Sequence, residues 1–273
     1  MLRQARQLLR QGYESCLEKV KDSDYFVSYA DEKFIHSQQV LGAGNYILKH
    51  EKWFASQSEQ FIDMTKAAIL LHDIGRFDQI SGQYADRSAK FDHGPMGALK
   101  LAQLPTYNDI RITLPIKHHG HLIEDFYADE EWKTLNDEKL KEEIEQIIFA
   151  IRDADKIANF NLIMYDKKML MPLFVPYLED IKDKRQQITD KVLEDFFAHS
   201  TVNHKNIATQ ADEMLTYIGW IFDINYPSSI RFCQKLNLIE MMFDTLLRFH
   251  NDKELNKRLK NEMNDYIRQR FGL

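Results

Sequence analysis

One stretch of ten residues constrains the fold most, because an unbroken apolar run leads directly into side chains that are costly to bury. The run Ala67–Leu71 is followed by His72, Asp73 and, three residues later, Arg76. Five apolar residues in a row suit a fully buried helix, but a buried carboxylate must be paired or bind a metal ion. Neighbouring residues diverge by about 100° on a helix of about 3.6 residues per turn. Both side chains can still reach one metal cluster beyond the helix face, although a structural histidine and a carboxylate near a glycine cap also fit.

The composition favours helices. Only ten glycines and six prolines occur among 273 residues, and we identify no strand pair and no internal repeat. A scarcity of both residues is typical of long helices rather than a turn-rich β fold. We therefore expect an all-α fold, with residues 1–165 as a metal-binding helical core. Residues 166–273 are expected to form a helical extension that packs on the core within one integrated domain.

Charge and cysteine content narrow the classes of partner. The net charge of −6 provides no general basic field for nucleic acid. No apolar stretch approaches the roughly 18–20 residues that span a bilayer, and the first residues lack the apolar segment of a secretory signal. Two cysteines, Cys16 and Cys233, do not form a disulfide framework. We expect a cytoplasmic protein without a membrane partner, and a homo-oligomer is left open.

Candidate ligands lie on or at the ends of the expected helices. A helix over residues 31–50 carries His36 near its start. Capping-box spacing in Ser56–Glu59 opens the helix that ends at His72 and Asp73. Residues 76–92 show little periodicity and are expected to form a loop that is long enough to be functional.

The next expected helix starts at Asp92, with His93 and Pro95 in its first turn. Residues 106–109 open another helix, which Pro115 breaks or kinks before it ends in three histidines. These three, His118, His119 and His121, occupy four positions in a chain that has ten histidines.

A long helix that Asn136 or Asp137 caps is expected to run to about residue 165. Asp155 follows Ile151 by four residues and so falls on its buried face, where a carboxylate needs a cation. Asp153 points elsewhere. Further helices are expected over 189–199, 206–223, 228–236, 238–249 and 253–270, after a break marked by Pro172 and Pro176.

Together these residues form a set of imidazoles and carboxylates of the kind that binds Fe, Mn, Co, Ni or Zn, with Mg as a further option. Seven candidates are too many for one tetrahedral ion and about right for two, and an aspartate can bridge two ions. No thiolate accompanies them, which excludes a structural cysteine-rich zinc site. The candidate metal ligands are His36, His72, Asp73, His93, His118, His119 and Asp155.

The ordered series His36…His72-Asp73…Asp155 resembles the H…HD…D motif of the HD-domain metal-dependent phosphohydrolases. The resemblance covers roughly residues 30–165. It implies an all-α bundle that holds metal ions between helices. His36 would be the first family histidine, His72 and Asp73 the doublet, and Asp155 the final aspartate, with Asp153 as the competing choice.

The histidines between the doublet and the final aspartate look like the additional ligands of the binuclear branch of this superfamily. His93 and one or both of His118 and His119 would bind the second ion. Members that cleave cyclic dinucleotides carry a Gly-Tyr-Pro element after the histidine pair. Residues 120–125 of this chain lack that element, so we do not infer that substrate.

The activity that the resemblance implies is hydrolysis of a phosphate ester or anhydride by metal-activated water. The substrate would be a nucleotide or a related small phosphorylated compound, with monoester or diester left open. Besides Asp73, Arg76 could grip a phosphate in bidentate fashion, and Lys156 could act as a point charge on it. Two alternatives stay open: an HD-fold di-iron oxygenase with nearly the same ligands, and an inactive nucleotide-binding module.

Overall fold

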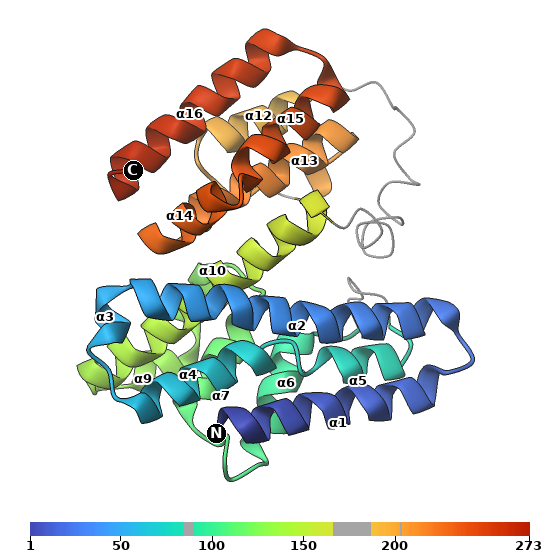
Figure 1. Cartoon of the computed structure of the whole chain (residues 1–273), viewed down its shortest axis with the longest axis vertical. Helices are drawn as coiled ribbons and strands as arrows, with labels where there is room; N and C mark the ends of the chain where they lie inside the picture. Colours follow the sequence, from blue (N-terminus) through green and yellow to red (C-terminus); the bar gives the residue numbers. More distant parts are fainter. Residues whose placement is uncertain (85–89, 166–186, 203) are drawn as a thin grey trace. The chain divides into compact units, whose positions relative to one another are not determined.

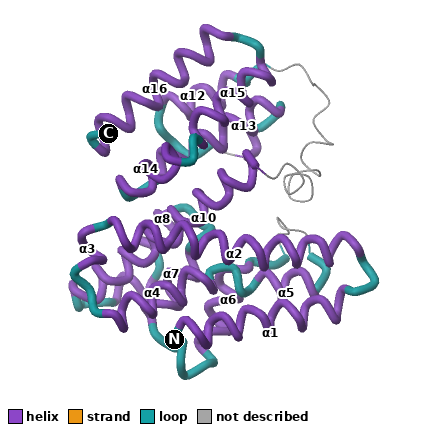
Figure 2. The backbone as a smooth tube through the Cα atoms, in the orientation of Figure 1, coloured by secondary structure: helices purple, strands orange, loops and turns teal. Residues whose placement is uncertain are grey.

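The computed structural model describes residues 1–84, 90–165, 187–202 and 204–273, and every regular element within these ranges is a helix (Figure 2). The all-α prediction is confirmed. Among the helices of these ranges, none is both long and apolar enough for a membrane span. The chain divides into two compact units, Met1–Ala158 and Asn159–Leu273, which we describe separately. The boundary between the units falls within the helix Glu138–Tyr165, and the boundary expected at residue 165 lies at the end of that helix.

The first unit is a helical assembly in which α1 packs against α2, α4 and α5, while α6 packs against α7 (Figure 1). Its helices are α1 (Leu2–Val20), α2 (Asp24–His50), α3 (Lys52–Ala55), α4 (Glu59–Leu71), α5 (Arg76–Ser81), α6 (His93–Ala102), α7 (Ile110–His118), α8 (Ile123–Ala128), α9 (Glu130–Thr134) and most of α10 (Glu138–Tyr165).

Helix α4 is the buried element that the sequence predicts. All residues of the run Ala67–Leu71 have no exposed surface. The helix is capped by Ser58, whose side chain accepts a hydrogen bond from the Phe61 amide. The expected capping box with Ser56 at the N-cap is therefore wrong, because Ser56 instead ends α3 and donates to the Trp53 carbonyl.

Two expected boundaries are wrong. Helix α2 begins at Asp24 rather than at residue 31, because Ser23 caps it by accepting from the Phe26 amide. The region 76–92 is not a loop throughout, since its first residues form α5. Residues 85–89 of that region, and the expected break at Pro172 and Pro176, lie outside the described residues.

Helices α6, α7 and α10 begin as expected, each at an aspartate. The side chains of Asp92, Asp109 and Asp137 accept hydrogen bonds from amides in the first turns of α6, α7 and α10. Pro115 lies inside α7 without ending it. Along α10, the side chains Ile144, Ile147, Ile148 and Ile151 have no exposed surface. These caps and apolar faces fix the ends at which the candidate ligands lie.

The second unit contains the end of α10, together with α12 (Asp190–Phe197), η1 (His204–Asn206), α13 (Gln210–Gly219), η2 (Trp220–Asp223), α14 (Pro227–Lys235), α15 (Leu238–His250) and α16 (Lys253–Phe271). Helix α13 is the core of this unit, because every residue from Ala211 to Gly219 is buried and α12 and α15 pack against it. Its start is fixed by a capping box between Thr209 and Asp212.

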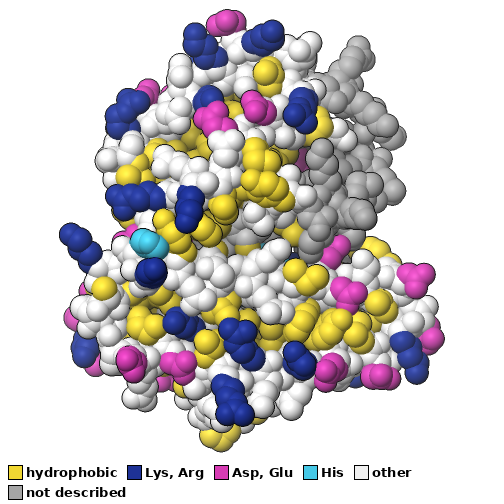
Figure 3. Space-filling model, in the orientation of Figure 1, with side chains coloured by type: hydrophobic (Ala, Val, Ile, Leu, Met, Phe, Trp, Pro, Cys, Tyr) yellow, Lys and Arg dark blue, Asp and Glu magenta, His cyan; other side chains and the backbone are white. Residues whose placement is uncertain are grey.

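The surface carries both signs of charge. Figure 3 shows Lys and Arg side chains interspersed with Asp and Glu on the visible face of the first unit, with apolar side chains between them. This mixture is in keeping with the net charge of −6.

Candidate metal centre

Two histidines that immediately follow helices are built in the same way. His72 follows α4, and its ring lies 2.9 Å from the Ile69 carbonyl through Nδ1. His119 follows α7, and its Nδ1 lies 2.7 Å from the Ile116 carbonyl. A carbonyl oxygen only accepts, so both Nδ1 atoms carry the proton, and each ring caps a carbonyl that the helix end leaves without a partner. In the neutral ring, each Nε2 atom is therefore unprotonated and presents a lone pair, which is the form that binds metal.

Glycines allow the helix ends to approach each other. A Cβ atom on Gly75 would lie 2.1 Å from the carbonyl oxygen of His93, and one on Gly94 would lie 2.6 Å from the Lys117 carbonyl oxygen. Any larger residue would push these backbones apart. The turn after α4, the start of α6 and the end of α7 are thereby held together, and this brings His93 to the doublet.

Asp73 lies at the centre of the group and is only 3% exposed. Its Oδ1 atom lies 3.1 Å from His93 Nε2 and 3.4 Å from His119 Nε2. Its Oδ2 atom lies 3.6 Å from Lys33 Nζ and 3.7 Å from His72 Nε2. The two carboxylate oxygens thus face two different sets of nitrogen atoms.

The charge of this carboxylate is stabilised by neighbouring cations. Burial alone would raise the pKa of Asp73, but the nearby Lys33 and Arg76 outweigh it and hold the pKa well below its usual value. Arg76 Nε lies 3.3 Å from Asp73 Oδ1, and its Nη1 donates to Gln79 Oε1 at 2.9 Å. Asp73 is therefore ionised at neutral pH, as a metal ligand must be.

A second carboxylate approaches from α10. Asp155 Oδ1 lies 2.8 Å from His36 Nε2 on α2 and 3.7 Å from His72 Nε2. Burial would raise the pKa of Asp155, but the hydrogen bond and charge of His36 lower it overall. Two groups of buried or half-buried side chains could each hold a metal ion, because the ligand atoms within each group lie within 4.8 Å of one another. One group is His36, His72 and Asp155, and the other is His72, Asp73 and His119.

His72 provides the clearest test of whether a metal ion fits. Its side chain has no exposed surface, and its Nε2 atom has no hydrogen-bond partner among the described residues. Burial lowers the pKa of His72 to about 4, so the ring is neutral at pH 7. A lone pair that faces two carboxylate oxygens is repelled by both unless a cation lies between them. The donor set therefore fits a divalent ion.

Six of the seven predicted ligands are brought together, and the exception is His118. Its Nε2 atom lies 2.7 Å from Asp129 Oδ2, which Lys117 also contacts. The sequence left open the choice between His118 and His119 and the choice between Asp153 and Asp155. The structure brings His119 and Asp155 to the group. Asp153 is fully buried on α10, and Lys156 is half-buried there.

Two residues of this region were missed by the sequence analysis. Lys33 precedes His36 by three residues on α2, and Arg152 precedes Asp155 by three residues on α10. Positions three apart share a helix face, so this spacing was the available signal. Arg152 is buried and donates to the backbone carbonyls of His119 and His121, which fixes the segment that carries His119.

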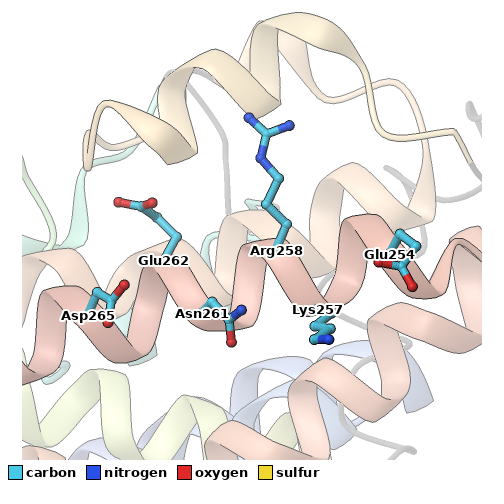
Figure 4. Close-up of a pocket in the computed structure, with 6 residues that line it drawn as sticks. All are labelled: Glu254, Lys257, Arg258, Asn261, Glu262 and Asp265. Atoms are coloured by element: carbon cyan, nitrogen blue, oxygen red, sulfur yellow. The ribbon is translucent and has the colours of Figure 1, made fainter.

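The second unit has a surface pocket of about 300 Å³ that lies along α16 (Figure 4). It is lined by charged and amide side chains, with Arg258 and Glu262 on the side opposite to Lys257. The charges are already engaged, because Glu262 lies 2.8 Å from His199 Nε2 and the Arg258 guanidinium lies 4.5 Å from the Phe197 ring centre. The centre around Asp73 is therefore the better candidate site.

No family model, no curated protein and no solved structure matches this chain.

Proposed function

We propose that the chain is a metal-dependent phosphohydrolase of the HD-domain type. The observation that carries the proposal is the position of Asp73, whose Oδ2 atom faces His72 while its Oδ1 atom faces His93 and His119. A carboxylate that is shared in this way suits a bridge between two ions. One ion would be held by His36, His72, Asp73 and Asp155, and the second by Asp73, His93 and His119.

Bound divalent ions would supply a water of lowered pKa and a Lewis acid for a phosphoryl oxygen. The protein's own residues hold the ligands in the required state. The Ile69 and Ile116 carbonyls fix the tautomers of His72 and His119, and burial keeps His72 uncharged. Fe, Mn, Co, Ni and Zn all suit this donor set.

The cations around the centre favour a phosphorylated substrate over the di-iron oxygenase alternative. Arg76 and Lys33 place two positive charges within 3.6 Å of Asp73 oxygens. Arg76 is proposed to bind a phosphoryl oxygen, and Lys156, next to Asp155, to add a second charge. The substrate is proposed to be a nucleotide or a related small phosphate compound, and the enzyme is proposed to work in the reducing cytoplasm with Cys16 and Cys233 as free thiols.

The proposal is tested with protein reconstituted separately with Mn²⁺, Co²⁺, Zn²⁺ and Fe²⁺. Each form is incubated with a chromogenic phosphodiester, a phosphomonoester and a panel of nucleotides, and phosphate release is measured. Turnover that is lost in Asp73→Asn supports the proposal. Oxygen consumption by the iron form, without hydrolysis of any phosphate compound, would replace it with the oxygenase.

A further inference from the structure

A second pair of histidines lies beside the centre but outside both of its ligand groups. His118 ends α7 and His121 follows three residues later, and their Nδ1 atoms are 3.2 Å apart. The His118 side chain is 8% exposed, and that of His121 is 29% exposed. One ring is thus held inside the protein while the other reaches solvent.

The outer nitrogen of each ring is bound to a carboxylate. His118 Nε2 lies 2.7 Å from Asp129 Oδ2, and His121 Nε2 lies 2.8 Å from Asp92 Oδ2. Ionised carboxylates only accept hydrogen bonds, so both Nε2 atoms must carry a proton. Lys117 lies 2.7 Å from the same oxygen of Asp129 and stabilises its ionised form.

This arrangement leaves the two inner nitrogens in conflict. A neutral imidazole carries one proton, so with both Nε2 atoms protonated, both Nδ1 atoms present lone pairs to each other. Two lone pairs at 3.2 Å repel unless a positive charge lies between them. A metal ion held by both Nδ1 atoms would supply that charge.

We propose that His118 and His121 chelate one divalent transition-metal ion through their Nδ1 atoms. With metal–nitrogen distances of about 2.0–2.1 Å, an Nδ1–Nδ1 separation of 3.2 Å corresponds to an angle of about 100° at the ion, close to tetrahedral. Imidazole suits Zn²⁺, Cu²⁺, Ni²⁺ and Co²⁺. Carboxylates on the opposite nitrogens orient such rings and strengthen them as ligands, and water can reach the ion beside His121.

The ion would connect two helix ends. Asp92, which holds His121, is the N-cap of α6 and directly precedes His93, while His118 directly precedes His119. Occupancy would therefore stabilise the contact between the start of α6 and the end of α7. The site uses none of the ligand atoms of the centre around Asp73, so it does not depend on the proposed hydrolase activity.

The test measures Zn²⁺ bound to the full chain by equilibrium dialysis and elemental analysis. The wild type is compared with His121→Gln, and with His50→Gln as a control at an exposed histidine whose Nδ1 lies 2.7 Å from the Tyr46 carbonyl. We expect His121→Gln to bind one equivalent less than both other proteins. Because this is a difference, it holds whether or not the main centre binds ions.

A second variant tests the carboxylate. Asn is as good an N-cap as Asp, so Asp92→Asn keeps the start of α6 while weakening the hold on His121 Nε2. We expect it to lower Zn²⁺ affinity at this pair by about tenfold. Electron paramagnetic resonance of one added equivalent of Cu²⁺ should detect two imidazole nitrogens in the wild type and fewer in His121→Gln.

Two results would overturn the proposal. One is equal Zn²⁺ content in the wild type and His121→Gln. The other is nuclear magnetic resonance of ¹⁵N-labelled histidine that finds both nitrogens of His121 protonated in the presence of saturating Zn²⁺. In that case a proton, rather than a metal ion, fills the space between the rings.

Discussion

Each unit buries an aspartate, and the two are satisfied in opposite ways. Asp212 in the second unit has no exposed surface, and its oxygens accept from the backbone amides of Thr189, Ala208 and Thr209 at 2.7–3.0 Å. Asp73 in the first unit is as deeply buried but is surrounded by side chains from separate elements. These are Lys33, His72, Arg76, His93 and His119.

The difference separates a structural carboxylate from a candidate ligand. Backbone amides hold Asp212 in place, and it needs nothing further to be stable inside the protein. His72 and His119, whose Nδ1 atoms face backbone carbonyls, point their Nε2 atoms towards Asp73, and a bound cation would relieve the repulsion between those lone pairs and the carboxylate. The same residue type at the same burial is therefore expected to respond differently to mutation and to metal.

The largest effect is expected at Asp73. Asp73→Asn keeps the side-chain volume but removes the shared negative charge, so bound metal and the proposed phosphohydrolase activity should fall together, activity by about a hundredfold or more. Elemental analysis and phosphate release measure the two. Unchanged metal content in this variant would contradict the bridging role.

Asp212→Ala should show the opposite pattern. It leaves three amide groups without an acceptor, at about 1–3 kcal/mol for each unsatisfied group, so the free energy of unfolding should fall by about 3 kcal/mol or more. Metal content per folded molecule should not change. Urea unfolding and elemental analysis on the same sample test this, and a loss of metal would remove the distinction between the two aspartates.

A smaller effect is expected at Arg152, which binds the carbonyls of His119 and His121. Arg152→Met should loosen the end of α7 and weaken metal affinity by about tenfold, and Arg152→Lys should restore part of it. Arg111→Gln is the control, because Arg111 pairs with Asp109 at the opposite end of α7. Equal affinities in both variants would show that Arg152 does not position His119.

The last prediction concerns pH. Burial lowers the pKa of His72 to about 4 and that of His93 to about 3, from a usual value near 6.5. The unfolded chain therefore binds these protons first, and stability is lost as the pH falls below about 6.5. Metal-free protein should lose up to about 1.4 kcal/mol per pH unit for each histidine.

Urea unfolding of chelator-treated protein between about pH 7 and pH 5 measures this slope. Bound metal should flatten it at the upper end, because protons must then displace the ion. A pH-independent unfolding free energy in the metal-free protein would mean that these rings are solvated or protonated, against their burial in the structure.

The sequence was sufficient for the features that depend on local chemistry. The all-α class, the buried run Ala67–Leu71 and the aspartate caps of α6 and α10 follow from periodicity and capping preferences. The spacing of Asp155 from Ile151 predicted a carboxylate that needs a cation, and the structure brings Asp155 Oδ1 to 2.8 Å from His36 Nε2. The membership of most ligands in one cluster was inferred from the HD-type resemblance rather than from spacing.

Other features depend on tertiary contacts that no local pattern contains. His118 and His119 are neighbours at one helix end, and their sequence positions do not show which of them faces Asp73; His118 pairs with Asp129 instead. Helix α5 was missed because its six residues are too few for a period to be detected. Lys33 and Arg152 are cations on amphipathic helices, and such residues are usually exposed.

The most direct test is the metal content of protein purified without chelator and then exchanged into metal-free buffer. We expect about two tightly bound transition-metal equivalents for each chain, both lost in Asp73→Asn, with the weaker His118–His121 pair filled only when ion is added. No bound metal in the wild type, even after reconstitution, would mean that the buried imidazoles and carboxylates around Asp73 are structural and would contradict the central claim.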